Sequence, residues 1–382
     1  MILSLQTTTF SAHGGIPTYN RLVCRVLNEM HEAGESHILI ATDSPADVEK
    51  SSPELPNLRF QAFDGSRASL SMRFMQLALA HKVDLLLIGH INYAPLGWML
   101  KRLQPQLRYG VMLYGIEAWQ SLGRMRGHAL RQANFTVSIS EYTKQRAVEI
   151  NALDEARMSL LPNALECSSI GSPFPEIPSS VAKGTRLLSV CRLEDTQQYK
   201  GVDKVLEVLP EVAKRTEDVQ YTVVGGGTDL ERHKKMAQEL GVSERVHFLG
   251  FVDDETLQSC YRECHLFVMP SAGEGFGFVF LEAMKHGKAI VAANSGGAPE
   301  VIQDGLTGCL VEYGNKEELT QKLIDLCLDP AKRDRFGLAG YRRLQENFTF
   351  ARFKEKLTEI LLRELPSETL ALGSSSRVRS SA

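Results

Sequence analysis

The sequence of 382 residues has no long apolar run, no excess of positive charge and no Asp-x-Asp motif. No apolar run approaches the ~20 residues that a membrane-spanning helix requires, and the N-terminus lacks the basic segment of a secretory signal. We therefore expect a cytoplasmic protein, attached at most to a membrane surface. The formal net charge of −3 argues against nucleic acid as the main partner, because proteins that bind it usually carry a strongly basic domain.

Patterns typical of metal sites and disulfides are also sparse. The seven cysteines are scattered and odd in number, which suits reduced thiols in a cytoplasm. Cys260, Cys264 and His265 resemble metal ligands, but no second Cys/His pair at zinc spacing follows, so core packing is the better interpretation. Because the chain also has no tight group of His, Asp and Glu, we expect neither a metal nor a cofactor.

The length of the chain predicts two domains, since one hydrophobic core rarely organises so many residues. We expect a first domain over residues 1–167, a Ser- and Pro-rich linker at 168–183 and a second domain over 184–349. A helix is expected at 350–365, returning to the first domain, and the Ser-rich end, 366–382, is expected to be disordered.

Strands alternate with amphipathic helices in both halves, which is typical of doubly wound parallel sheets in an α/β protein. In the first half, strands are expected at 2–7, 37–41, 83–88, 109–113 and 135–138, and helices at 19–33 and 141–150. In the second half, strands are expected at 186–190, 220–224, 246–249, 265–269 and 289–292, and helices at 202–213, 230–240, 254–260, 279–286 and 350–362. Ligands of such sheets bind outside the carboxyl ends of the strands.

A glycine-rich loop follows the expected strand at 265–269. Gly273, Gly275 and Gly277 allow close approach of the backbone and precede a helix that Gly287 ends. The free N–H groups and the positive dipole end of such a helix form an anion site suited to a diphosphate.

Two acidic residues accompany this loop. Glu282 lies about one turn inside the helix, where its carboxylate can accept hydrogen bonds from a ribose diol, whereas Glu274 lies in the loop itself. The two acids would address opposite ends of one ligand. The alternative is that they only stabilise the N-terminal part of the helix.

Two cations lie at the same edge of the expected second sheet. Arg192 follows the strand at 186–190, and Lys200 precedes the helix at 202–213. Together they would neutralise a pair of phosphates, with Arg as a planar fork and Lys as a mobile point charge. The alternative is that either is an ordinary surface charge.

Other glycine clusters are weaker. Gly14 and Gly15 open the first helix but match neither a Walker loop nor a complete G-x-G-x-x-G fingerprint. Residues 225–227 are all glycine, yet Leu230 stands where the last glycine of that fingerprint belongs. A nicotinamide cofactor is therefore not indicated.

The region 101–146 is locally basic, with eight Lys and Arg against two Glu. It would suit anionic lipid headgroups, as a peripheral membrane contact, or a phosphorylated acceptor. The alternative is a set of solvated helix faces.

The residues above resemble glycosyltransferase family 4, the retaining enzymes with the GT-B fold. The resemblance covers most of the chain and is strongest over 187–314. The matching positions are Arg192 with Lys200 and Gly201, Glu274 and Glu282 with Gly275, Phe276 and Gly277 between them, and Ser295, Gly296, Gly297, Ala298, Pro299 and Glu300 followed by Gly305 and Gly308.

The resemblance implies two Rossmann-like domains that face each other across a cleft. It also implies transfer of a hexose, with retention, from a nucleotide diphosphate sugar of the GDP-mannose or UDP-glucose type to a saccharide or a lipid-linked saccharide. By resemblance, Arg192 and Lys200 grip the diphosphate, Glu274 contacts the transferred sugar, Glu282 holds the ribose, the backbone of Phe278 and Val279 caps the distal phosphate, and Gly14 and Gly15 lie near the phosphates.

One position departs from the family pattern. Relatives often have a His within a His-Gly-x-Glu-x-Trp-like motif, and Tyr114 stands in its place here, followed by Glu117 and Trp119. Any role carried by that His is thereby in question, and we assign Tyr114 and Glu117 to the acceptor side.

Two other functions remain open. An epimerase of nucleotide sugars on the same fold would convert the donor without an acceptor. A binding module for sugars or nucleotides would release no nucleoside diphosphate, although the presence of Arg192, Lys200, Glu274 and Glu282 argues against it.

Overall fold

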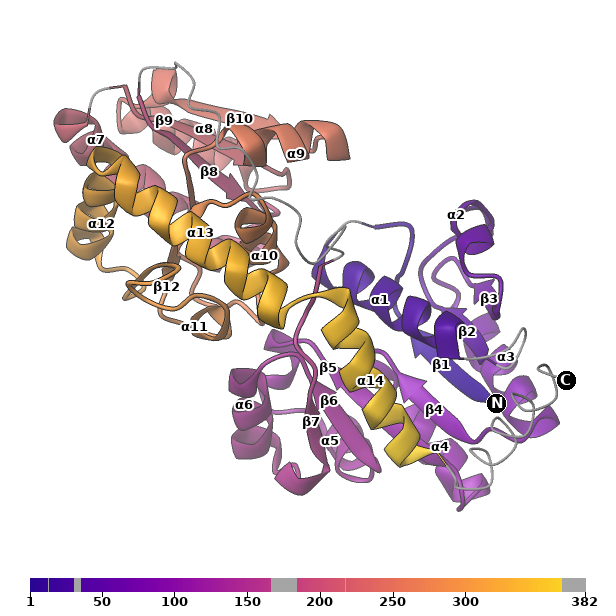
Figure 1. Ribbon diagram of the computed structural model, residues 1–382. Coiled ribbons are helices and arrows are strands. Elements are labelled where there is room, and N and C mark those ends of the chain that lie inside the picture. The colour runs from indigo at the N-terminus through magenta and orange to yellow at the C-terminus, as the bar shows by residue number, and fades with distance from the viewer. Residues whose placement is uncertain (13, 31–35, 166–183, 217, 366–382) are drawn as a thin grey trace, which may run out of the picture. The chain divides into compact units, whose positions relative to one another are not determined.

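The computed structural model divides the chain into two compact α/β units (Figure 1). The first contains Met1–Ala164 and the chain from Phe350 onward, and the second contains Leu165–Thr349. The structure describes all residues except 13, 31–35, 166–183, 217 and 366–382. The predicted linker at 168–183 and the predicted tail at 366–382 therefore lie outside the described residues.

The first unit is built on a parallel sheet with the strand order β3-β2-β1-β4-β5-β6-β7. The order reverses between β1 and β4, which pair directly with each other, so this unit has a switch point of the doubly wound type. Its strands are β1 Ile2–Gln6, β2 Ser36–Ile40, β3 Leu58–Ala62, β4 Leu85–Ile88, β5 Arg108–Leu113, β6 Phe135–Ser138 and β7 Met158–Leu160.

Helices cover this sheet. They are α1 Gly15–Met30, α2 Pro45–Ser51, α3 Arg67–Ala80, α4 Ala94–Leu103, α5 Arg124–Arg131, α6 Glu141–Asn151 and α14 Phe350–Glu364. Helix α14, drawn in yellow in Figure 1, contacts α1, where the rings of Tyr19 and Phe353 lie 5.2 Å apart. A buried cluster of apolar side chains joins the sheet to α3, α4, α5 and α6.

The second unit is built on a parallel sheet with the strand order β10-β9-β8-β11-β12-β13. Its order reverses between β8 and β11, where Leu187 pairs with Leu266. The strands are β8 Arg186–Val190, β9 Gln220–Val224, β10 Val246–Gly250, β11 Leu266–Met269, β12 Ala289–Ala293 and β13 Gly308–Val311. The predicted pair of doubly wound parallel sheets is thus confirmed.

Helices of the second unit pack on this sheet through apolar stripes. In α7, Val202, Val205, Leu209 and Val212 recur every three or four residues and are all buried. They join the core between the sheet and helices α8 and α12. The helices are α7 Val202–Arg215, α8 Leu230–Glu239, α9 Asp254–Glu263, α10 Phe278–Lys285, α11 Ala298–Val301, α12 Lys316–Leu328 and α13 Pro330–Asn347.

The structure differs from the sequence-based expectations at several elements. Helix α1 begins at Gly15 rather than at residue 19, because Pro17 is accepted in the first turn of a helix, where its missing N–H is not needed. Helix α3 was not predicted, since Met72 and Leu79 are 64% and 65% exposed and blur its apolar stripe. None of the helices in the described part of the chain has both the length and the apolar character needed to traverse a bilayer.

Candidate functional site

The loops that follow β8 and β11 lie side by side in the second unit because the two strands are neighbours in the sheet. The N–H of Ala272 donates to the carbonyl of Tyr199 at 2.8 Å. Gly201 has a φ of +80°, and a Cβ there would lie 2.3 Å from the carbonyl oxygen of Pro270. Only glycine allows this approach, so the residue after Lys200 determines how closely the two loops pack.

This packing brings Lys200 and Glu274 together. Nζ of Lys200 lies 2.7 Å from Oε2 of Glu274, and the two side chains are only 18% and 14% exposed. Burial alone would lower the pKa of Lys200, but the Glu274 carboxylate together with Tyr199 and Cys191 opposes it, and the pKa is raised overall. The lysine is therefore held as a cation at the carboxyl edge of the sheet.

The loop after β12 supports Glu274 from the other side. The N–H of Gly297 donates to the carbonyl of Glu274 at 2.7 Å. The hydroxyl of Ser295 donates to the carbonyl of Ala272 at 2.6 Å. A Cβ at Gly297 would lie 2.3 Å from the carbonyl oxygen of Gly275. These glycines and this serine therefore fix the position of the Glu274 loop through backbone contacts.

Helix α10 begins directly after this loop without a side-chain cap. Gly277, at the N-cap, has a φ of +94°, and no side chain caps the first turn at Phe278 and Val279. Phe276 is buried and packs on Phe348 with ring centroids 5.4 Å apart, which anchors the entry to the helix. An uncapped, glycine-led helix start is suited to an anion.

Glu282 lies on α10, where its carboxylate has a partner that the sequence did not reveal. The hydroxyl of Tyr261 donates to Oε2 of Glu282 at 2.7 Å. Burial raises the pKa of Glu282, and the hydrogen bond from Tyr261 opposes that rise. Tyr261 is fully buried on α9, which extends to Glu263, beyond the predicted end at residue 260. The predicted helix stopped one residue before Tyr261, so the sequence analysis did not place this tyrosine on α9.

Arg192 is placed differently from Lys200. Its side chain is exposed and, within the described residues, forms no hydrogen bond or ion pair. Its backbone is nevertheless tied down, because Leu193 donates to the carbonyl of Gly226 at 2.9 Å. A Cβ at Gly225 would lie 1.9 Å from the carbonyl oxygen of Cys191. Of the two predicted cations, the structure thus pairs only Lys200 with Glu274 and leaves Arg192 open to solvent.

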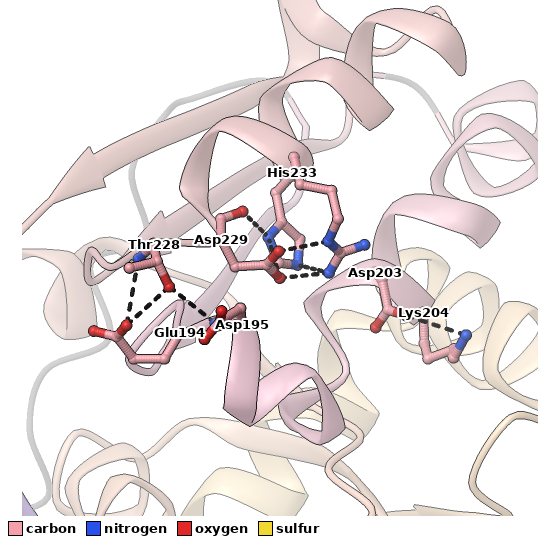
Figure 2. Close-up of polar contacts among 8 residues, drawn as sticks. Glu194, Asp195, Asp203, Lys204, Thr228, Asp229 and His233 are labelled. Carbon is pink, nitrogen blue, oxygen red and sulfur yellow. Dashed lines mark hydrogen bonds and ion pairs between the residues drawn. The ribbon is translucent and has the colours of Figure 1, made fainter.

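Polar side chains join the Arg192 loop to the loop after β9, as Figure 2 shows. Oγ1 of Thr228 donates to Oε2 of Glu194 at 3.0 Å and accepts from the N–H of Asp195 at 3.1 Å. Asp229 accepts two hydrogen bonds from Arg232, of 2.6 and 2.5 Å, and the first cause of its lowered pKa is this arginine. Sequence reasoning missed the contacts of Thr228 with Glu194 and Asp195 because the sheet order brings these two loops together, whereas Asp229 and Arg232 form a local i,i+3 pair.

Two of the predicted site residues of the first unit, Gly14 and Gly15, lie at the start of α1. Gly14 and Gly15 are exposed, and Gly14 has a φ of +140°. The preceding loop is held by the buried carboxylate of Asp43, which accepts from the N–H groups of Thr9 and Phe10 at 3.0 and 2.6 Å. Asp43 thus fixes the backbone at Thr9 and Phe10, a few residues before the glycines.

Tyr114 and Glu117 are both engaged within the first unit. The buried Tyr114 donates its hydroxyl hydrogen to Oδ1 of Asn20 at 2.9 Å, and its ring packs on Tyr19. The carboxylate of Glu117 accepts from the backbone N–H of Tyr114, and burial raises its pKa. Their contact with an acceptor stays a prediction.

The cysteines near the second sheet make ordinary structural contacts. Cys264 is buried and its thiol donates to the carbonyl of Tyr261, while Nδ1 of His265 accepts from the N–H of Arg186 at 2.9 Å. In the part of the chain that the structure describes, no group of three or more His, Cys, Asp and Glu is arranged to hold a metal ion. The expectation that no cofactor is needed stays a prediction.

Comparison with known proteins connects this geometry to a family. Residues 175–343 match the family model described as "Glycosyl transferases group 1". Over 308 residues the chain is 30% identical to the GDP-mannose-dependent alpha-(1-6)-phosphatidylinositol monomannoside mannosyltransferase of Mycolicibacterium smegmatis. The aligned region covers 77% of this chain and 80% of the relative.

Solved structures share the fold at lower identity. Anabaena Alr3699/HepE in complex with UDP superposes with a TM-score of 0.77 and 19% identity, covering 95% of this chain and 99% of that one. Sucrose-phosphate synthase from Thermosynechococcus elongatus gives a TM-score of 0.75 at 20% identity, covering 95% and 98%. At these identities the likeness is one of fold.

Proposed function

Because the chain belongs to the glycosyl transferases group 1 family and has the GT-B fold, we propose that it is a retaining enzyme of glycosyltransferase family 4. It takes a hexose from a nucleotide diphosphate sugar and passes it to a hydroxyl of a saccharide or glycolipid. The nucleotide-sugar epimerase and the binding module are not favoured, because the relatives are named as transferases.

The observation that carries the proposal is the pairing of Lys200 with Glu274 beside the uncapped start of α10. A diphosphate needs positive charge, and Lys200 and the helix N-terminus supply it at adjacent strand ends. Arg192, exposed and without an ion-pair partner in the described residues, adds a second cation that is free to turn toward a ligand.

The remaining polar groups divide the donor between them. Glu282 accepts hydrogen bonds from the ribose diol, and the N–H groups of Phe278 and Val279 bind the distal phosphate. Glu274 reaches the hydroxyls of the transferred sugar while it stays paired with Lys200. The charge of the leaving diphosphate is met by protein cations and backbone N–H groups, so turnover needs no added metal.

The chemistry is a front-face displacement. The bond between the anomeric carbon and the phosphate oxygen breaks while the acceptor oxygen forms its bond to that carbon on the same face. The proton of the acceptor hydroxyl moves to a phosphate oxygen of the leaving diphosphate. The pairing of Glu274 with Lys200 fits a binding role better than a nucleophilic one. Fixed positive groups near the leaving oxygens stabilise the charge that develops there.

We take GDP-mannose as the donor and a lipid-linked saccharide or phosphoinositide-type glycolipid as the acceptor. Both choices rest on the names of the sequence relatives, which use GDP-mannose and act on phosphatidylinositol monomannoside. UDP-glucose is the competing donor, since a structure with the same fold was solved with UDP.

The test is a donor assay on the purified protein. GDP-mannose and UDP-glucose are each incubated with and without a glycolipid acceptor, and the released nucleoside diphosphate and the sugar products are measured. The proposal requires release of nucleoside diphosphate that depends on acceptor, and a product anomer that matches the donor by NMR. An epimer formed without acceptor, or nucleotide binding without any release, would establish one of the alternatives instead.

A further inference from the structure

Helices α4 and α5 of the first unit expose apolar and basic side chains and contain no Asp or Glu. Met99, Leu103 and Met125 are 49%, 61% and 62% exposed. Arg102 and Arg124 are exposed beside them. Long apolar side chains interleaved with arginine are unusual on a face that only meets water.

The two helices form one continuous surface. They contact each other, and the rings of Trp98 on α4 and His128 on α5 lie 5.1 Å apart. The guanidinium of Arg102 lies over the Trp98 ring at 5.7 Å. Trp98 therefore links the exposed stripe of α4 to that of α5. We call this surface the α4–α5 face; it consists of Trp98, Met99, Arg102, Leu103, Arg124 and Met125.

The basic residues of the region 101–146 that lie outside α4 and α5 are paired with carboxylates. Arg108 pairs with Glu364, Lys144 with Glu155 and Arg146 with Glu149. On α4 and α5 themselves, Lys101, Arg126 and Arg131 donate to neutral oxygens of Asn134, Asn92 and Asn151 and keep their charge. No ion pair in the described residues involves the arginines of the α4–α5 face. The positive charge that is open to a partner is thus concentrated where the apolar side chains are exposed.

We propose that the α4–α5 face docks on an anionic lipid bilayer. Met99, Leu103 and Met125 enter the interface between headgroups and acyl chains, while Arg102 and Arg124 meet lipid phosphates. A tryptophan with one apolar and one polar edge suits the same depth. The inference deepens the proposed function, because a lipid-linked acceptor is held in such a bilayer, but its evidence is independent of the donor site.

The charge pattern and the apolar residues together select this occupant. A nucleic acid would use the arginines and gain little from the exposed methionine and leucine side chains. A protein interface also favours methionine and arginine, but it would have to supply an acidic partner for each arginine of a face whose helices contain no Asp or Glu. A bilayer with anionic lipids rewards both features, and each basic residue near its surface contributes about a fivefold gain in partitioning.

The experiment is sedimentation of the full-length protein with phosphatidylcholine vesicles that contain or lack phosphatidylglycerol. The wild type should bind the anionic vesicles, and binding should fall as salt is raised. Arg102→Gln with Arg124→Gln should weaken partitioning roughly 25-fold, from two charges at about fivefold each. Leu103→Ser with Met125→Ser should weaken it at low and at high salt.

Matched controls lie in the second unit. Lys234→Gln with Lys235→Gln removes two exposed charges from α8, and Leu328→Ser removes a leucine that is 62% exposed on α12. Both controls should partition as the wild type does, and circular dichroism melts should show that all variants are folded.

Several results would overturn the docking proposal. One is that the wild type stays in the supernatant with anionic vesicles. Another is that the variants of the α4–α5 face partition as the controls do. Loss of binding in the arginine pair alone, with heparin competing as well as vesicles, would establish a polyanion contact in place of a bilayer. Thermal shift with GDP in the same preparation tests the donor site separately, so failure of one proposal is distinguishable from failure of the other.

Discussion

The hydroxyl of Tyr261 donates a 2.7 Å hydrogen bond to the carboxylate of Glu282, joining α9 to α10 beneath the proposed ribose site. Tyr261 itself is held by stacking, with its ring parallel to that of His286 at 5.6 Å. This buried hydroxyl orients the carboxylate without being exposed to a ligand. Tyr261 is therefore a positioning residue that acts through Glu282.

Replacing Tyr261 with phenylalanine should weaken donor binding while leaving the ring packing in place. A hydrogen bond to a charged group contributes about 1.5–3 kcal/mol, so KM for the donor should rise on the order of tenfold to a hundredfold with a smaller change in kcat. Tyr313→Phe, at a tyrosine that is 40% exposed, is the matched control. A donor that lacks the ribose hydroxyls should bind the wild type and Tyr261→Phe equally. If Tyr261→Phe also bound that donor more weakly, the variant would have only a packing defect.

Removal of the lysine cation should abolish most turnover. Lys200→Ala takes away the charge opposite Glu274, and loss of one preorganised group at the leaving diphosphate costs roughly a hundredfold to a thousandfold in kcat. Lys234→Ala, at an exposed lysine of α8, should leave the rate unchanged. Steady-state kinetics and a thermal melt are the measurements. A folded Lys200→Ala variant with near-normal kcat would remove Lys200 from the mechanism.

Donor binding should weaken as pH falls, because the pKa of Glu282 is raised by burial. The ionised carboxylate accepts hydrogen bonds from the ribose more strongly than the protonated acid does, so protonation should begin to reduce affinity above the ordinary carboxyl range near 4.5. Titration calorimetry with GDP over the pH range is the measurement. Glu282→Gln should lose this pH dependence, and an identical profile in both proteins would contradict the assignment.

The same shift has a consequence for stability. A raised pKa means that the folded protein binds the proton more tightly than the unfolded chain does. Proton binding by Glu282 therefore adds to the free energy of unfolding below pH 4.5, and this contribution is lost as pH rises through the folded pKa of Glu282. Glu282→Gln should therefore melt at a higher temperature than the wild type at neutral pH, while binding the donor less well. Thermal melts at pH 4 and pH 7 measure the difference; a variant that is equally stable or weaker at pH 7 would argue against a strained buried carboxylate.

Adding one methyl group at Gly297 should displace the Glu274 loop. The new Cβ would lie 2.3 Å from the carbonyl oxygen of Gly275, a contact that backbone atoms cannot relieve without moving. We expect Gly297→Ala to lower kcat/KM at least tenfold, since shifts of about 1 Å at a site have large effects on rate. Gly123→Ala, where a Cβ meets nothing within 4 Å, is the control. Equal activity of the two variants would show that the loop tolerates the shift.

Much of this protein is readable along the chain. Local apolar patterns predicted parallel sheets in both halves, and the structure confirms them. Helices such as α4 and α5 escaped prediction because their exposed apolar residues weaken the local period that identifies a helix. The motif residues between Lys200 and Glu282 also predicted a glycosyltransferase by resemblance, and the family comparison supports that prediction.

The sequence by itself determined where the backbone can turn sharply, because a positive φ such as that of Gly277 depends on one residue and its neighbours. Only the tertiary structure decided which side chains meet. Lys200 and Glu274 are 74 positions apart, and Tyr261 and Glu282 are 21 apart. Their contacts exist because the sheet places β8 next to β11 and packs α9 near α10, and such neighbours follow from burial of the whole core rather than from any local spacing.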